Sequence, residues 1–329
     1  MTMYGGGPVD PDVDLLRGGQ GRRADPVSEI ERGTEGVWTP GPGAAPRDDV
    51  PANVGFWKRF RRNKTSMAAL FYLVVLILGA FFASTIAPHD PNEQALQEVN
   101  NKPSADHLLG QDDLGRDVFS RILYGARVSL SASLLAVSLA LIVALPLALL
   151  AGYVGGTIDL ILMRIADAIQ VIPALVLALV ISGVLGPSVR NVALALGIVF
   201  APGFIRLIRG QVLGVREDTF IEASRSIGAK PLFIIRKRVL HNVASPLIVQ
   251  VAVSFGFALL AEASLSFLGL GVQAPDASWG TMLNRAFSQV FEAGWLLWIP
   301  GLAIAFTVLA FNLIGDGLRD ALGTETRGA

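Results

Sequence analysis

The sequence predicts an all-α membrane protein with six transmembrane helices. Of its 329 residues, 52% are hydrophobic and only 16% are charged, a composition too apolar for a soluble protein of this length. The apolar residues gather in long stretches without Asp, Glu, Lys or Arg. Basic residues concentrate in alternate connections between these stretches, as expected of a chain that crosses a membrane repeatedly.

Five charge-free stretches are each long enough to span a bilayer, which needs about 20 apolar residues. They lie between Lys64 and Asp90, Arg127 and Asp159, Asp167 and Arg190, Arg238 and Glu262, and Glu292 and Asp316. A sixth candidate, between Arg190 and Arg206, has only 15 uncharged residues, so we expect it to span only if these arginines reach the interfaces. Four prolines inside the spans predict bends, which suit a moving bundle and a static one equally well: Pro146, Pro173, Pro202 and Pro300.

The chain divides by composition into four parts. Residues 1–54 lack an apolar core and are rich in Gly, Pro and Asp, which predicts a disordered tail rather than a secretory signal peptide. Residues 55–66 carry five positive charges and three aromatic rings, which predict a short interfacial helix or, equally, a simple charge anchor. Residues 67–323 form the predicted transmembrane domain, and residues 324–329 form a C-terminal tail.

The distribution of charge predicts the orientation. The positive-inside rule places the basic segment 55–66, and with it the N-terminus, in the cytoplasm. Six spans then return the C-terminus to the cytoplasm and place the loop 213–245 there. From Arg206 to His241 eight basic residues accompany three acids, whereas the first outer loop, 89–126, is rich in acids. We therefore expect a multi-pass protein of the cytoplasmic membrane with both termini inside.

Several classes of function are excluded or disfavoured. A net charge of zero gives no case for nucleic-acid binding, and the absence of cysteine excludes disulfides and thiolate metal sites. Three histidines far apart in sequence, His89, His107 and His241, predict no metal cluster. None of the five lysines follows a glycine, so the chain has no nucleotide-binding P-loop. We expect no cofactor and no catalytic residue in this chain.

The basic loop 213–245 begins with the pattern of a short helix. Thr219 and Glu222 have the spacing of a capping box, which predicts a helix from residue 220 to about residue 227. Gly228 can then adopt the left-handed conformation that ends a helix.

A second helix is predicted from residue 232 to residue 240, because Pro231 suits its first position. The pair would expose Phe220, Ile221 and Ile227 beside Arg225, an apolar surface suited to docking in a groove of another protein. An amphipathic connector packed on the bundle is the alternative.

These residues resemble a known family. Glu222-Ala223-Ser224, three residues and then Gly228 resemble the "EAA" loop of ABC-importer permeases. Three further stretches resemble the C-type permease subunit of dipeptide/oligopeptide importers, a family that also includes nickel and glutathione permeases: HLLGQDDLGRDVFSRILYGARVSL from His107, EASLSFLGLGVQAPDASWGTML from Glu262, and FNLIGDGLRDAL from Phe311. The resemblance covers residues 56–323. Family loops usually have Ala where Ser224 stands and Pro where His241 stands, and neither change removes the helix or the turn.

The resemblance implies a type I ABC importer permease fold in which a coupling helix inserts into an ATPase subunit. It implies that this chain forms half of a pathway for dipeptides or oligopeptides, with a homologous second permease, two ATPase subunits and an extracytoplasmic solute-binding protein as partners. ATP hydrolysis is then expected on the partner chains. The residues implied in coupling are Phe220, Ile221, Glu222, Ala223, Arg225 and Gly228.

Four charged positions outside this loop are also candidates for function. Glu262, an acid inside an apolar run, either faces the pathway or a gate, or else pairs with the turn from Ser264 to Gly271. Arg116, Asp117 and Arg121 either contact a solute-binding protein or form a locally paired, solvated helix. In the third span, Arg164 and Asp167 have the spacing of an ion pair on one helical face.

The sequence gives little support to two other classes of function. An ion-coupled secondary carrier often shows inverted repeats and acids at mid-membrane, and here we find no clear repeat and only Glu262 as such an acid. An intramembrane hydrolase needs a matched catalytic pair within the spans, and none is visible.

Overall fold

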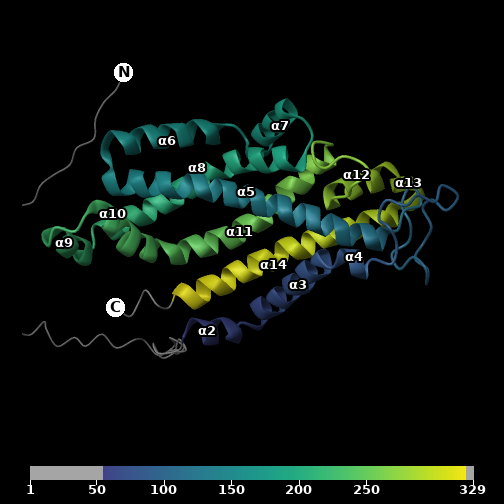
Figure 1. Ribbon diagram of the computed structural model, residues 1–329, viewed down its shortest axis with the longest axis horizontal. Coiled ribbons are helices and arrows are strands. Elements are labelled where there is room, and N and C mark those ends of the chain that lie inside the picture. The colour runs from purple at the N-terminus through teal and green to yellow at the C-terminus, as the bar shows by residue number, and fades with distance from the viewer. Residues whose placement is uncertain (1–54, 324–329) are drawn as a thin grey trace, which may run out of the picture. The chain divides into compact units, whose positions relative to one another are not determined.

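A computed structural model describes residues 55–323; the predicted tails 1–54 and 324–329 lie outside the described residues. The regular elements of the described part are all helices, and its one β-bridge is an isolated pairing of Gln111 with Asp117. This confirms the all-α prediction. Its long helices form a bundle and run along a roughly common direction (Figure 1).

Five helical segments are long and apolar enough to cross a membrane, and a bent pair makes the sixth. The five comprise α3 (Lys64–Phe81), α5 (Val118–Val154), α8 (Val189–Arg216), α10 to α11 (Pro231–Phe267) and α13 to α14 (Val290–Gly323). The sixth consists of α6 (Gly156–Val171) and α7 (Ala174–Leu185), which are bent by 88° at a break that contains Pro173. The structure therefore has the six predicted spans if this broken pair is counted as one span.

The basic segment before the first span is a separate short helix, α2 (Phe56–Arg62). It ends at Asn63, whose side chain accepts a hydrogen bond from the Ser66 amide and so begins α3. The predicted segment 55–66 thus contains all of α2 and the first three residues of α3. Phe60 is the buried residue of α2, and its ring lies against Gly317 of α14 (Trp298–Gly323).

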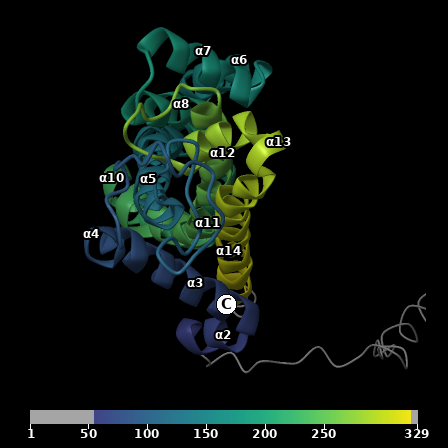
Figure 2. The ribbon, with the colours of Figure 1, turned by 90° about the vertical axis from the view of Figure 1, so that its right-hand side faces the viewer.

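The bundle is built around α5, which packs most extensively along α8 and also contacts α11 (Leu240–Phe267). Small residues allow this approach, since an added Cβ at Gly152 or Gly197 would lie 2.8 Å from Val212 or 2.9 Å from Leu139. Helix α14 packs on α11, and α3 packs on α14. Figures 1 and 2 place α3 and the α6–α7 pair on opposite sides of this group.

Helix α8 is much longer than its 15 uncharged residues suggested. Its two internal arginines are neutralised by acids of α6: Arg206 pairs with Asp167 at 2.8 Å, and Arg209 donates to both carboxylate oxygens of Asp159. The predicted pair of Arg164 with Asp167 is therefore wrong. Because the partners lie on a neighbouring helix, the charges can stay within the helical segment rather than mark its end.

The two ends of the bundle carry different structures. At one end, the short helices α9 (Thr219–Ser226) and α10 (Pro231–Ile234) connect α8 to α11 (Figure 1). At the other end lie the loop 87–117 after α4 (Ala83–Ile86), the helices α12 (Trp279–Ser288) and α13 (Val290–Ala293), and the 3-10 turn η2 (Gly294–Leu297). Trp279 anchors α12, because its buried indole donates to the Ile122 carbonyl of α5 at 3.1 Å.

Candidate functional site

The loop between α8 and α11 contains the predicted helix, but with a different start. The N-cap of α9 is Asp218, so Thr219 is its first residue and the predicted capping box is wrong. No side chain caps this helix. Glu222 is exposed, and among residues 55–323 its carboxylate forms no hydrogen bond or ion pair. Glu222 therefore does not fix the start of the helix, and its negative charge is available to a partner protein.

The two faces of α9 differ sharply. Ile221 is fully buried and packs in the same apolar cluster as Ile234 and Val239, so the prediction that it is exposed is wrong. This contact holds α9 against the bundle. Ile227, by contrast, is 84% exposed, and three other large apolar side chains are exposed beside it: Phe220, Leu232 and Phe233. We call these four residues the apolar tip.

A tight turn separates α9 from α10. Gly228 has a φ of +76°, and its amide donates to the Arg225 carbonyl at 2.9 Å, as predicted for a glycine that ends a helix. Arg225 itself extends back over the ring of Tyr153, 5.3 Å from its centroid. Helix α10 then continues through the π-helical turn η1 (Ile235–Val239) into α11, so the predicted second helix is the beginning of a span rather than a separate element.

A polar cavity opens beside the break between α6 and α7. Its volume is about 320 Å³, and α8 and α11 complete its walls. Gln170, Gln250 and Ser254 supply its polar side chains, and Gln250 and Ser254 lie near the middle of α11. A larger cavity of about 810 Å³ between α3, α5, α11 and α14 has a mostly apolar lining. The smaller cavity therefore combines a position near the middle of α11 with hydrogen-bonding groups.

The broken backbone at this cavity is itself exposed. Ile172 and Pro173, at the break, are open on the surface of the chain. Non-helical backbone at membrane depth is stable only where protein covers it or where it lines a water-filled space.

Glu262 lies near the end of α11 and is only 1% exposed. Its Oε1 accepts a hydrogen bond of 2.6 Å from Ser266 Oγ, within the turn from Ser264 to Gly271. Helix α12 covers this turn closely, because an added Cβ at Gly280 would lie 2.3 Å from the Ala263 carbonyl oxygen. The arrangement favours pairing with the turn over exposure to a pathway.

The three residues predicted to contact a binding protein, Arg116, Asp117 and Arg121, are each 2% exposed. Direct contact through these side chains needs exposed atoms, and a solvated helix would leave them open to water. Arg116 is paired locally with Asp112, as the second alternative predicts, but the three side chains are buried rather than solvated. All three instead hold together the loop 87–117 and the start of α5.

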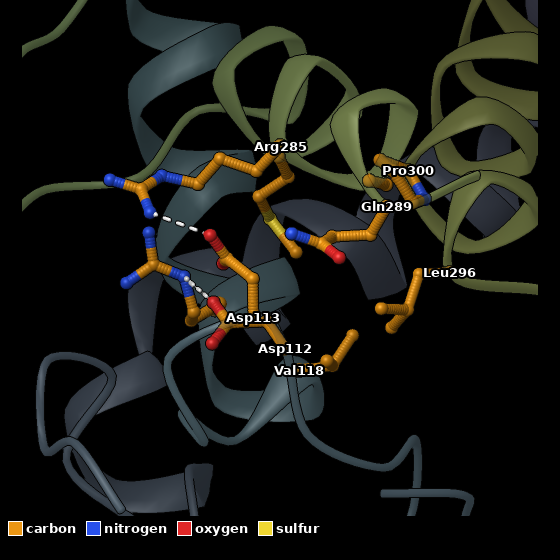
Figure 3. Close-up of a pocket in the computed structure, with 10 residues that line it drawn as sticks. Asp112, Asp113, Val118, Arg285, Gln289, Leu296 and Pro300 are labelled. Carbon is orange, nitrogen blue, oxygen red and sulfur yellow. Dashed lines mark hydrogen bonds and ion pairs between the residues drawn. The ribbon is translucent and has the colours of Figure 1, made fainter. Parts of the chain in front are cut away.

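Figure 3 shows part of this cluster, including the contact between Arg285 and Asp113. Asp112 forms ion pairs with Arg116 at 2.6 Å and with Arg121 at 3.5 Å. Asp113 forms an ion pair with Arg285 of α12 at 3.1 Å. The cluster encloses a cavity of about 20 Å³, enough for about one water molecule. It ties the loop 87–117 to α12.

Two of the three histidines, whose separation in the sequence predicted no metal cluster, lie together at this end. The rings of His89 and His107 stack with their centroids 4.5 Å apart, and both face the carboxylate of Asp117. Separation along the sequence therefore did not predict separation in space, and no local pattern could have joined them.

Comparisons with known proteins agree with this architecture. Residues 144–328 match the family described as "Binding-protein-dependent transport system inner membrane component", and residues 54–103 match the "N-terminal TM domain of oligopeptide transport permease C". The glutathione transport system permease proteins GsiD of Escherichia coli O6:K15:H31 and of Shigella boydii serotype 4 are both 44% identical to this chain over 274 residues. That of Shigella dysenteriae serotype 1 is 43% identical. In each case the match covers 83% of this chain and 90% of the relative.

These matches leave the ion-coupled secondary carrier without support. They also show that the chain is a membrane permease component and not an enzyme. The chain belongs to the family of binding-protein-dependent transport system inner-membrane components, as a multi-pass permease subunit of an ABC importer.

Proposed function

We propose that this chain forms one half of the pathway by which an ABC importer takes up short peptides, and that the loop 217–230 couples the pathway to an ATPase. A homologous second permease, two ATPase subunits and an extracytoplasmic solute-binding protein complete the importer. The apolar tip carries this proposal. Four large apolar side chains are exposed around a helical turn, beside the Glu222 carboxylate, and such a surface is typical of a site where another protein docks.

The coupling residues are those of this exposed surface and its turn. Phe220, Glu222 and Ala223 are exposed on α9, and Gly228 sets the direction of the chain towards Leu232 and Phe233. Ile221 supports them from inside the subunit. Movement of the docked ATPase would be transmitted by this buried contact, and through the continuous helix from Pro231 to Phe267, to the middle of the membrane.

The pathway runs past the polar cavity at the α6–α7 break. The absence of cysteine makes this testable, because single cysteines introduced at Gln250 and at Ile142 can be compared in the assembled importer. Ile142 is exposed on α5, on the apolar surface of a span. We expect a water-soluble thiol reagent to label Gln250→Cys and not Ile142→Cys. Equal labelling, or labelling of Ile142→Cys alone, would contradict the pathway.

The proposed substrate class rests on the relatives. The GsiD proteins are named for glutathione, a tripeptide, and one of the matching families is named for oligopeptide transport. Gln170, Gln250 and Ser254 offer donors and acceptors but no charge, which suits passage of a peptide backbone rather than tight binding of an ion. Uptake of a labelled dipeptide by the importer should be inhibited by unlabelled dipeptides or glutathione and not by free amino acids.

In the proposed orientation both termini and residues 213–245 are cytoplasmic, and the loop 87–117 with α12 faces outwards. Residues 1–54 are then a cytoplasmic tail, residues 67–323 the permease domain and residues 324–329 a short tail. The excess of basic over acidic residues in 213–245 supports this orientation. A cysteine introduced at Lys230 should resist impermeant reagents in intact cells and react after lysis. Reaction in intact cells would invert the topology.

A further inference from the structure

We propose that His89, His107 and Asp117 form a binding site for a divalent transition metal of the zinc type, at the end of the bundle opposite the coupling loop. Their three ligand atoms all lie within 4.8 Å of one another. The site is separate from the apolar tip and from the polar cavity, so it does not depend on the proposed substrate or on coupling.

The distances between the ligand atoms suit one tetrahedral ion. His107 Nδ1 lies 3.0 Å from Asp117 Oδ1, and His89 Nδ1 lies 3.9 Å from the same oxygen. Two ligands bound to zinc at about 2.0–2.1 Å in a tetrahedron are separated by about 3.3 Å. The observed separations fall on either side of this value, so only small rotations of the imidazole rings are needed.

One ligand atom has no partner in the protein. His89 Nδ1 is buried and forms no hydrogen bond with any described residue, although it points towards Asp117. A buried polar atom without a partner carries a desolvation cost of about 1–3 kcal/mol. A bound cation would remove this cost, because the nitrogen would become a ligand.

The backbone positions the ligands in advance. Asp117 is the N-cap of α5, and its Oδ2 accepts from the Ser120 amide at 2.7 Å, which leaves Oδ1 directed at the histidines. The hydroxyl of Ser120 in turn accepts from the His89 amide at 3.3 Å. The His107 amide donates to Ser104 Oγ at 3.1 Å. Such outer contacts fix the orientation of metal ligands in proteins.

The local charge also favours a cation. The neighbouring acids Asp112 and Asp113 are neutralised by arginines, whereas within residues 55–323 the carboxylate of Asp117 has only the two histidines as potential cationic partners. The histidine side chains are 35% and 20% exposed, so an ion and a water molecule can reach them from solvent. Two imidazoles and one carboxylate with an open fourth position match a common donor set of zinc.

A bound ion would join three parts of the chain: the segment after α4 that carries His89, the loop that carries His107, and the first turn of α5. Metal binding at such a junction stabilises the folded loop, because an ion that binds only the folded state shifts the folding equilibrium. Because protons compete with a metal ion for imidazole nitrogens, binding should weaken as the pH falls.

The test uses the complete importer, purified without a polyhistidine tag, treated with a chelator and titrated with zinc in competition with a chromophoric chelator. His89→Gln is the decisive variant, because within residues 55–323 His89 Nδ1 forms no hydrogen bond that its replacement would break. His241→Gln is the matched control, since His241 is the third histidine of the chain and lies on α11 at the opposite end. Partner subunits contribute equally to all samples.

We expect the wild-type and His241→Gln importers to bind one zinc ion more than His89→Gln, or to bind it at least about tenfold more tightly. Cobalt should give the visible absorption of a tetrahedral site in the wild type and lose it in His89→Gln. Zinc should raise the melting temperature of the wild type and not of the variant. Equal zinc affinity in wild type and His89→Gln, with no change in the cobalt spectrum, would show a plain histidine–aspartate hydrogen bond and overturn the proposal.

Discussion

Replacing Ile227 by serine should weaken docking of the ATPase without affecting the folding of the subunit. Ile227 is 84% exposed in the subunit, so the substitution removes no internal contact of consequence. Full burial of an isoleucine side chain stabilises by about 1.5–3 kcal/mol, and 84% of that is about 1.3–2.5 kcal/mol. If the ATPase covers the apolar tip, its affinity for the permease should fall by about tenfold to about seventyfold.

The affinity can be measured by titrating purified ATPase onto permease pairs held in lipid nanodiscs. Leu96→Ser is the matched control, because Leu96 is equally a large exposed apolar residue but lies in the loop 87–117 at the other end. We expect unchanged membrane abundance for both variants and weakened ATPase binding for Ile227→Ser alone. Unchanged ATPase affinity in Ile227→Ser, or equal loss in Leu96→Ser, would refute the assignment of the apolar tip as the docking surface.

Three other changes test the same loop. Ile221→Ala should destabilise the subunit by about 2–5 kcal/mol, seen as a lower melting temperature, because Ile221 is fully buried; unchanged stability would contradict its supporting role. Gly228→Val should uncouple ATP hydrolysis from uptake, since a β-branched residue at a φ of +76° costs about 1–3 kcal/mol; normal coupling would show that the turn is dispensable. Glu222→Gln should lose ATPase affinity as Glu222→Ala does, because the carboxylate caps no helix; retention by Gln alone would show that the role does not depend on charge.

Much of the fold could be predicted from where charges are absent. Four of the five charge-free stretches correspond to single long helical segments, because lipid admits apolar helices whose backbone groups are satisfied internally, and the fifth, from Asp167 to Arg190, contains the break between α6 and α7. The count of uncharged residues failed for α8, where Arg206 and Arg209 remain inside the helix by pairing with acids of α6. Such a pair joins residues far apart in the chain, so no local window reveals it.

The candidate sites show the same limit. Gly228 was predictable, because a positive φ after a helix strongly favours glycine. The cap was misassigned by one residue, because both Asp218 and Thr219 are good N-cap residues and sequence spacing alone favoured Thr219. The burial of Ile221 and the meeting of His89 with His107 depend on how the elements pack. Pro173 predicted a bend, but its 88° size follows from the packing of α6 and α7 on α8.

The most direct test of the account is uptake by the complete importer in sealed proteoliposomes that contain no ion gradient. A labelled dipeptide, presented by its binding protein, should accumulate only when ATP is supplied on the ATPase side. Omission of the ATPase subunits, or a non-hydrolysable ATP analogue, should abolish uptake. Accumulation without the ATPase subunits, driven by an imposed proton or sodium gradient, would contradict the assignment of this chain as the permease half of an ATP-driven pathway.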